Sequence, residues 1–203
     1  MIVALIPIGS IDGAKSRLGA VLDAEERRDL VLRLARGTIR AAVATPGIDE
    51  TIVVTPDDEV RELALREGAR PLRQRSRGLN DGLREARDEA MAAGADAVLV
   101  LPIDIPHVSP ELLGPLVTEA LGASGPLVAV VPDRHDRGTN ALVLAPPDVI
   151  DFCFGGDSKS AHVEAARTSG ARVELLDGPL TLDLDTPEDL LLAQQETPEA
   201  VGG

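Results

Sequence analysis

The chain has 203 residues, of which 44% are hydrophobic and 1% aromatic, and its formal net charge is −14. This length suits one domain with a core of Val, Leu, Ile and Ala. The charge opposes nucleic-acid binding, although a local group of Lys and Arg can still hold a small phosphorylated ligand. The single cysteine, Cys153, excludes an internal disulfide. No apolar run reaches the ~20 residues that span a bilayer, so we expect a cytoplasmic protein with neither a nucleic-acid nor a membrane partner.

Strands and helices alternate along the chain, separated by turn and capping residues. Strands are expected at residues 2–7, 51–54, 70–72, 97–101, 127–131 and 141–145, with short ones around Val173 and Leu182. Helices are expected at 23–44, 57–67, 81–93, from 109 onward, at 158–169 and from 186 onward. The first begins with a capping box formed by Asp23 and Glu26. Such alternation predicts one α/β domain with a mostly parallel sheet.

The stretch AVLVLPIDIPH, residues 97–107, is the centre of this pattern. Five consecutive apolar residues suit a parallel strand that is buried on both faces. Asp104 follows between two prolines, at the carboxyl end of the strand, where open α/β sheets bind their ligands. The residue is either a metal-binding carboxylate or a turn aspartate that bonds its own backbone.

Two other features point to phosphate chemistry. After the first strand comes a loop with Gly9 and Gly13, followed by Lys15 and Arg17. Glycines let the backbone approach a phosphate, and two cations can hold a triphosphate; a solvated surface loop is the alternative. Near the end of the chain, Asp183 or Asp185 could join Asp104 to chelate Mg²⁺, although Asp185 is also well placed to cap a helix.

A third feature is the pair of segments DRHDRGTNAL and FGGDSKS. Their hydroxyl and backbone N–H groups could bind an anion, with Ser158 capping the helix that follows, or they could be ordinary surface turns. A run of four arginines between residues 70 and 77 could attract a nucleotide or be an exposed loop. No histidine has a partner pattern that indicates catalysis.

Together these residues resemble the guanylyltransferases that activate a phosphorylated three-carbon acid in the biosynthesis of the deazaflavin coenzyme F-420. The matching segments, in the order of that family, are AKSRL (14–18), GLN (78–80), the PxDxP around Asp104, GTNAL (138–142), FGxxS (154–158) and DxDTPEDL (183–190). The resemblance implies a single-domain, three-layer α/β/α nucleotidyltransferase fold with a Rossmann-like, mostly parallel sheet. Independently of the resemblance, the length and the loose character of the residues after Glu196 predict one domain over residues 1–196 and a flexible tail at 197–203.

The resemblance also assigns roles to individual residues. It implies an enzyme that transfers GMP from GTP to phosphoenolpyruvate or 2-phospho-L-lactate and releases pyrophosphate. Lys15 and Arg17 would face the GTP phosphates as catalytic groups, on a nucleotide-binding loop with Gly9 and Gly13, and Asn80 would lie near the guanine. A Mg²⁺ cofactor would be held by Asp104 and Asp185. The acceptor would be bound by Thr139, Gly155 and Ser158.

Two positions depart from the family pattern beside the expected acceptor pocket: Arg137 stands where a small residue is common, and Asp157 replaces a glycine. The alternatives are another nucleotidyltransferase of the same fold, acting on 3-phosphoglycerate, a molybdopterin or a cytidylyl acceptor, or a non-catalytic nucleotide-binding domain. A homodimer is possible on this reading. The sequence does not distinguish among the three-carbon acceptors.

Overall fold

A seven-stranded sheet forms the centre of the computed structural model, which describes residues 1–195. In order across the sheet, the strands are β3 (Arg70–Arg73), β2 (Glu50–Thr55), β1 (Ile2–Pro7), β4 (Ala97–Val100), β6 (Thr139–Ala145), β5 (Leu127–Pro132) and β7 (Arg172–Leu175). The strand order reverses between β1 and β4, because β1 leads outward to β2 and β3 while β4 starts the other half. This reversal is the place where open α/β sheets leave a crevice for ligands.

Within this sheet, β6 alone runs against its neighbours, β4 and β5. Residues 133–138 connect β5 to β6, and so short a connection cannot make the crossover that parallel strands need. The antiparallel direction has a consequence for the site. The first residue of β6, Thr139, lies at the same edge of the sheet as the carboxyl ends of the parallel strands.

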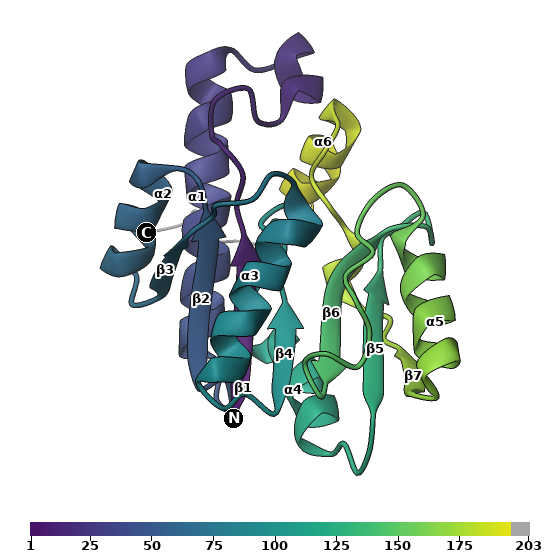
Figure 1. Cartoon of the computed structure of the whole chain (residues 1–203). Coiled ribbons are helices and arrows are strands. Elements are labelled where there is room, and N and C mark those ends of the chain that lie inside the picture. The colour runs from purple at the N-terminus through teal and green to yellow at the C-terminus, as the bar shows by residue number, and fades with distance from the viewer. Residues whose placement is uncertain (196–203) are drawn as a thin grey trace.

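Helices cover both faces of the sheet (Figure 1). The helices are α1 (Ala24–Ala44), α2 (Asp58–Arg66), α3 (Leu79–Ala92), α4 (Pro110–Leu121), α5 (Ser158–Ser169) and α6 (Pro187–Gln195), with 3-10 helices η1 (Ser16–Ala20) and η2 (Pro179–Thr181). Apolar residues of α1, α2 and α4 form the core on one face, and those of α3 and α5 form the core on the other. Within residues 1–195, no helix is both long enough and apolar enough to cross a membrane.

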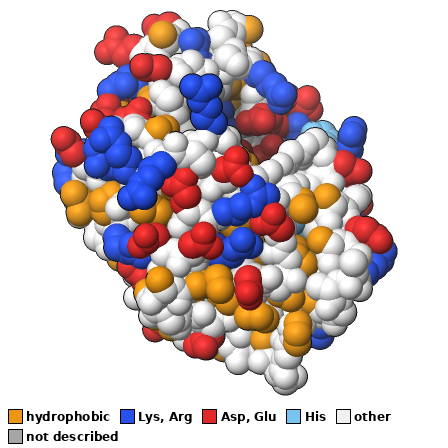
Figure 2. Space-filling view, viewed as in Figure 1, with side chains coloured by type: hydrophobic (Ala, Val, Ile, Leu, Met, Phe, Trp, Pro, Cys, Tyr) orange, Lys and Arg blue, Asp and Glu red, His pale blue; other side chains and the backbone are white. Residues whose placement is uncertain are grey.

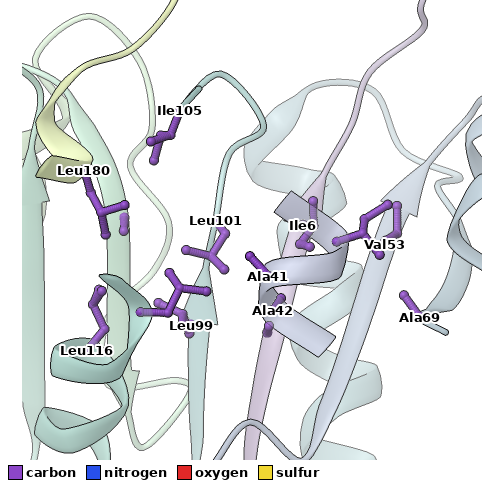
Figure 3. Packing of buried hydrophobic residues seen from close by; sticks show 14 of the residues in the cluster. Ile6, Ala41, Ala42, Val53, Ala69, Leu99, Leu101, Ile105, Leu116 and Leu180 are labelled. Carbon is purple, nitrogen blue, oxygen red and sulfur yellow. The ribbon is translucent and has the colours of Figure 1, made fainter. Parts of the chain in front are cut away.

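The alternation of side chains along the strands supplies both cores. On β1, Ala4 and Ile6 face the first helix layer while Val3 and Leu5 face the second, and all four are buried. Figure 3 shows the first core, in which Leu99 of β4 lies near α4. The five inner strands are almost wholly buried, whereas the edge strands β3 and β7 are partly exposed, and the loops at the carboxyl edge project from this buried centre.

The structure confirms the three-layer α/β/α architecture and most of the expected elements, including α1 with its capping box at Asp23 and Glu26. The strand expected around Leu182 is wrong. This segment contains η2 and irregular backbone, because Gly178 and Pro179 turn the chain into a 3-10 helix. Leu182 is buried but belongs to no strand. The predicted tail at 197–203 lies outside the described residues, and the domain boundary at 196 stays a prediction.

Candidate functional site

The loop after β1 places Lys15 at the crevice. The main-chain N–H of Ile8 donates to the Val54 carbonyl at 3.0 Å, and the buried side chains of Ile8 and Ile11 fix the loop to the core. Lys15 then adopts left-handed backbone angles, with φ at 52°, immediately before η1. Few non-glycine residues hold this conformation, and Asp136 is the other one within residues 1–195.

The Lys15 side chain lies between two carboxylates. Its Nζ is 2.8 Å from Oδ1 of Asp185 and 3.7 Å from Oδ2 of Asp104, and the side chain is only 11% exposed. Arg17 approaches Asp185 from solvent, at 3.6 Å, and is 74% exposed. We call Lys15, Arg17, Asp104 and Asp185 the lysine–aspartate cluster. Residues far apart in the sequence are therefore brought together as the matching segments predicted.

Hydrogen bonds to main-chain carbonyls hold the segment that contains Asp185 against the loop that contains Asp104. The N–H of Leu184 donates to the Asp104 carbonyl at 2.8 Å, which fixes the segment before α6 to the loop after β4. The buried side chain of Asn140 on β6 donates to the carbonyls of Leu180 and Thr181, at 3.0 and 2.9 Å. Asn140 was missed by sequence reasoning because its role depends on a segment 40 residues away.

Asp185 does not cap α6, although its position in the sequence allowed that role. The helix is capped instead by Thr186, whose hydroxyl accepts from the N–H of Asp189 while the Asp189 carboxylate accepts from the Thr186 N–H at 2.7 Å. The same carboxylate accepts the Asp185 N–H at 3.0 Å. Arg134 forms an ion pair with Asp189, whose side chain is 4% exposed. The TPED sequence carried this capping-box signal.

The Asp189 pKa lies below its ordinary value, because these hydrogen bonds and Arg134 outweigh the opposing effect of burial. The acids at the crevice behave differently. Burial raises the pKa of Asp104, with Asp185 adding to the rise and Lys15 opposing it. Burial, and then the nearby carboxylate of Asp104, also raise the pKa of Asp183. Three carboxylates thus share the crevice with Lys15 and Arg17, and a further cation there would favour the charged forms of the buried acids.

A strand around Leu182 would have placed Asp183 and Asp185 at its carboxyl end, but the structure has no strand there, so neither residue follows a strand. Asp104 does follow β4. Among the residues that the structure describes, no group of three or more Asp, Glu, His or Cys side chains is arranged to hold a metal ion by itself. Two carboxylates are nevertheless a sufficient protein contribution for Mg²⁺, which takes its other ligands from water and substrate phosphates.

A cavity of about 310 Å³ opens beside the cluster, lined by Gly9, Lys15, Arg17 and Asp185 among others. Gly13 instead lines an adjoining cavity of about 480 Å³, between the loop and the start of α1. Figure 2 shows Lys and Arg side chains interspersed with Asp and Glu over the upper part of the molecule, where η1 and α6 lie in Figure 1. The first cavity is large enough for part of a nucleotide.

On the other half of the same edge, Thr139 contacts a buried histidine. Its Oγ1 lies 3.1 Å from Nδ1 of His162 on α5, and the main-chain N–H of Cys153 donates to Nε2 of the same ring at 3.0 Å. The Phe154 ring packs edge-on against His162, with centroids 4.9 Å apart. We call Thr139, His162, Cys153 and Phe154 the threonine–histidine cluster. Sequence reasoning gave no role to His162.

The expected acceptor-binding residues Gly155 and Ser158 lie at the start of α5. Gly155 has φ at 149°, a value that favours glycine, and faces open space. Ser158 does not cap the helix as expected: it is the first helical residue, Asp157 occupies the cap position, and Asp157 makes no capping bond through its side chain. The Ser158 hydroxyl makes no hydrogen bond within residues 1–195, so it is available to a ligand.

Asn80 lies at the start of α3 and uses both ends of its amide on Phe154. Its Nδ2 donates to the Phe154 carbonyl at 3.0 Å, and its Oδ1 accepts the Phe154 N–H at 2.9 Å. The arrangement ties α3 to residues 146–157 between β6 and α5, a segment that we call the acceptor loop because it contains Gly155. The guanine contact of Asn80 stays a prediction. In the arginine run, Arg70 pairs with Glu50 and Glu89, and Arg73 with Asp58.

Comparisons with known proteins find relatives over nearly the whole chain. Two phosphoenolpyruvate guanylyltransferases are 44% and 42% identical to the chain, from Sphaerobacter thermophilus over 189 residues (93% of this chain, 90% of the relative) and from Rubrobacter xylanophilus over 190 residues (93% and 91%). A 2-phospho-L-lactate guanylyltransferase from Methanocaldococcus vulcanius is 27% identical over 190 residues (93% and 82%).

Among solved structures, one from Desulfovibrio desulfuricans G20, assigned as a nucleotide-diphospho-sugar transferase, superposes with a TM-score of 0.79. The two chains are 19% identical, with 98% of this chain and 89% of that one covered, so this likeness supports the fold alone. Residues 2–194 match the family described as guanylyl transferase CofC like. With the fold, the charged crevice and this match in agreement, the chain belongs to the CofC-like guanylyl transferase family.

Proposed function

We propose that this guanylyltransferase transfers GMP from GTP to the phosphate of phosphoenolpyruvate, with release of pyrophosphate. The observation that carries the proposal is the position of Lys15, held between Asp104 and Asp185 beside a cavity at the crevice of the sheet. Phosphoenolpyruvate is favoured over 2-phospho-L-lactate because relatives above 40% identity carry the former name and the 27% relative carries the latter. A role in coenzyme F-420 biosynthesis stays a prediction from the resemblance.

In the proposed reaction, an oxygen of the acceptor phosphate attacks the α-phosphorus of GTP. A bond forms between that oxygen and the phosphorus, and the bond to the bridging oxygen of the β-phosphate breaks, so that pyrophosphate leaves with the electron pair. A phosphate monoester has its second pKa near ~6 and is largely dianionic at neutral pH. The nucleophile therefore needs no general base, and the protein has to supply position and charge.

Lys15 and Arg17 supply the positive charge on the donor side. Lys15 is almost enclosed, so its ammonium group interacts with a phosphate through a medium of lower dielectric than water. Arg17 is exposed and can follow the departing pyrophosphate. When GTP phosphates enter the cavity, Lys15 can exchange a carboxylate partner for a phosphate oxygen without a change in its backbone.

The residues fit a Mg²⁺ ion, which would be held by Asp104 and Asp185, with Asp183 nearby. All the donors are carboxylate oxygens, and burial, the main cause of the raised pKa values of Asp104 and Asp183, is an effect that a bound cation would oppose. When bound, the ion would neutralise phosphate charge and align donor with acceptor. Asp189 serves this site indirectly, because it holds the backbone of Asp185.

The acceptor would occupy the space near Thr139, Gly155 and Ser158. Hydroxyl and main-chain N–H donors at the start of α5 suit the phosphate and carboxylate of a small acid, and the positive end of the helix adds to the attraction. Replacing Thr139 with Val should therefore raise the acceptor KM while leaving the GTP KM unchanged. A defect confined to GTP would contradict this placement.

The experiment is pyrophosphate release from GTP with Mg²⁺, run with phosphoenolpyruvate, 2-phospho-L-lactate, 3-phosphoglycerate and no acceptor. We expect release with phosphoenolpyruvate and GTP, and none when CTP or ATP replaces GTP. Selective use of 2-phospho-L-lactate or 3-phosphoglycerate would keep the transferase and change the acceptor. No release with any acceptor, or equal use of CTP, would overturn the proposal.

A further inference from the structure

His162 is the most enclosed ionisable group near the acceptor site. The residue is fully buried on α5, and both ring nitrogens have partners at hydrogen-bonding distance. Its partners are the main-chain N–H of Cys153, on the acceptor loop, and the hydroxyl of Thr139, at the start of β6. The reaction proposed above uses Thr139 but assigns nothing to this histidine.

The contact with Cys153 determines where the ring carries its proton. A main-chain N–H can only donate, so Nε2 of His162 must be an unprotonated acceptor. The neutral ring then carries its proton on Nδ1. A charged ring would place a second N–H against that of Cys153, and burial lowers the pKa of His162 to about 4. The ring is therefore neutral, with Nδ1–H facing Thr139.

This arrangement fixes the Thr139 hydroxyl as the acceptor in its contact with His162, which leaves its own proton for a ligand. Its oxygen accepts the Nδ1–H of His162 through one lone pair, so its own proton remains available. Within residues 1–195 the hydroxyl has no other hydrogen-bond partner. A threonine hydroxyl usually rotates to donate or accept, but here the oxygen already accepts from His162, so the O–H group is free to donate to a ligand.

We propose that His162 is a positioning residue that makes the Thr139 hydroxyl a fixed donor to an anionic oxygen of the acceptor, a carboxylate or phosphate oxygen. This inference rests on the proposed function, because it specifies how that acceptor is held. The bond to an ionised oxygen is of the stronger, charge-assisted kind, and it needs no reorientation of the hydroxyl when the acceptor arrives.

The surroundings hold the ring in the required orientation. The edge of Phe154 packs against it, and Asn80 fixes the backbone of Phe154 through two hydrogen bonds. On the other side, the N–H of Lys159, one turn before His162 on α5, donates to the Arg137 carbonyl at 3.0 Å. The start of α5, the acceptor loop and the β5–β6 connection are thereby joined around the imidazole.

The proton position can be measured in the ligand-free protein by ¹⁵N NMR of the histidine rings. The chain has three histidines, and the His162 signals are those lost in H162N. We expect the His162 proton on Nδ1 at pH 7. A proton on Nε2, or a charged ring at that pH, would overturn the inference whatever the enzyme's substrate is.

Two conservative variants separate positioning from packing. In H162N the side-chain amide can place an N–H where Nδ1 was, toward Thr139, whereas in H162Q the amide oxygen can reach the Cys153 N–H at the Nε2 position. We expect H162Q to raise the phosphoenolpyruvate KM by about 10- to 100-fold, the effect of losing one charge-assisted bond. H162N should stay much closer to the wild-type KM, and the GTP KM should be unchanged in both. Rescue by Gln rather than Asn would show that His162 only supports the loop.

A double-mutant cycle completes the test. If His162 acts through Thr139, H162Q should add no further rise in the acceptor KM when introduced into the T139V variant. Additive effects would overturn the inference. The control is His135→Gln, which changes an exposed histidine and should leave both KM values unaltered. Absence of turnover in the wild-type protein would instead reject the proposed function, while the NMR result would still report the proton position.

Discussion

The lysine–aspartate cluster and the threonine–histidine cluster lie at the same edge of the sheet but are built differently. The first is made of full charges, and Asp185 and Arg17 are 39% and 74% exposed at their side chains. The second consists of neutral groups around a histidine with no exposed surface, and burial keeps that histidine uncharged. Charge in the first cluster can be exchanged with ligand phosphates, while hydrogen-bond directions in the second are set before any ligand arrives.

The difference follows from what each side would bind. A triphosphate brings several negative charges that leave again as pyrophosphate, so movable cations in a partly hydrated crevice are suitable partners. A small acid must be held in one orientation for its phosphate to reach the α-phosphorus, and preset donors in a dry pocket do this with less reorganisation. Salt should therefore weaken the donor side more than the acceptor side, because exposed charges are screened and buried neutral bonds are not.

The largest effect is expected from Asp104→Asn, which tests the charged cluster. Turnover should fall by a factor on the order of 10²–10³, the usual result of removing one electrostatic contact to the transition state. Unfolding temperature should be equal or higher, because the pKa of Asp104 is raised and its charge is therefore unfavourable in the folded protein. Steady-state kinetics and thermal unfolding measure both. Asp88→Asn, on the exposed side of α3, is the matched control, and near wild-type turnover in D104N would remove Asp104 from the site.

The second prediction uses pH to test the neutral cluster. The pKa of His162 falls from 6.5 to about 4 on folding, so between these values the unfolded chain binds the extra proton. Stability is therefore fully present above pH 6.5 and declines as pH falls toward 4, by about 3 kcal/mol for this group. Urea unfolding at pH 7 and pH 4.5 should show a smaller loss in H162Q than in the wild type. Equal losses would mean that His162 titrates normally.

Asp189→Asn tests whether the hydrogen bonds of Asp189 hold Asp185 in place within the lysine–aspartate cluster. The substitution keeps the shape of the side chain but removes the charge that Arg134 faces and weakens three hydrogen bonds from Asp185 and Thr186. We expect a loss of about 2 kcal/mol in the free energy of unfolding and a lower kcat, with the acceptor KM little changed. Asp148→Asn, an exposed acid, is the control. A change in the acceptor KM alone would show that Asp189 supports the threonine–histidine cluster and not the lysine–aspartate cluster.

The smallest effects are expected at the two unusual charges near the acceptor pocket. Arg137 is exposed and has no ion pair within residues 1–195, and Asp157 occupies the cap position of α5. Arg137→Gln should raise the acceptor KM two- to fivefold, because it removes an attractive charge, and Asp157→Asn should lower it by a similar factor, as expected for exposed charges worth under ~1 kcal/mol. Both changes should disappear at high salt. Effects that persist at 1 M salt would indicate direct contact with the acceptor.

Local sequence signals predicted the parts of the fold that depend on neighbours in the chain. The capping box of α1 and strand β4, which begins at Ala97, are examples, since each is specified within a few residues. The meeting of Lys15, Asp104 and Asp185 was predictable as well, because each matches a family motif and Asp104 lies at a known binding edge of such sheets.

The other site residues could not be found this way. The roles of His162 and Asn140 depend on partners 9 to 41 positions away, and the pairing of Asp189 with Arg134 spans 55 positions; these partners meet only after the sheet has assembled. The error at Leu182 has a similar origin. Its hydrophobicity indicated burial, but the choice between a strand and an irregular segment was made by Gly178, Pro179 and the clamp from Asn140.

The reciprocal pair between Asn80 and Phe154 limits how this enzyme can be re-engineered. Both bonds use main-chain atoms of residue 154, so they fix the spacing of the loop independently of the Phe154 ring, which packs against His162. An acceptor loop transplanted from a relative would keep its geometry only if it matched this length and its new host kept an asparagine at position 80. Inserting or deleting a single residue before position 154 would shift the register and separate the graft from α3.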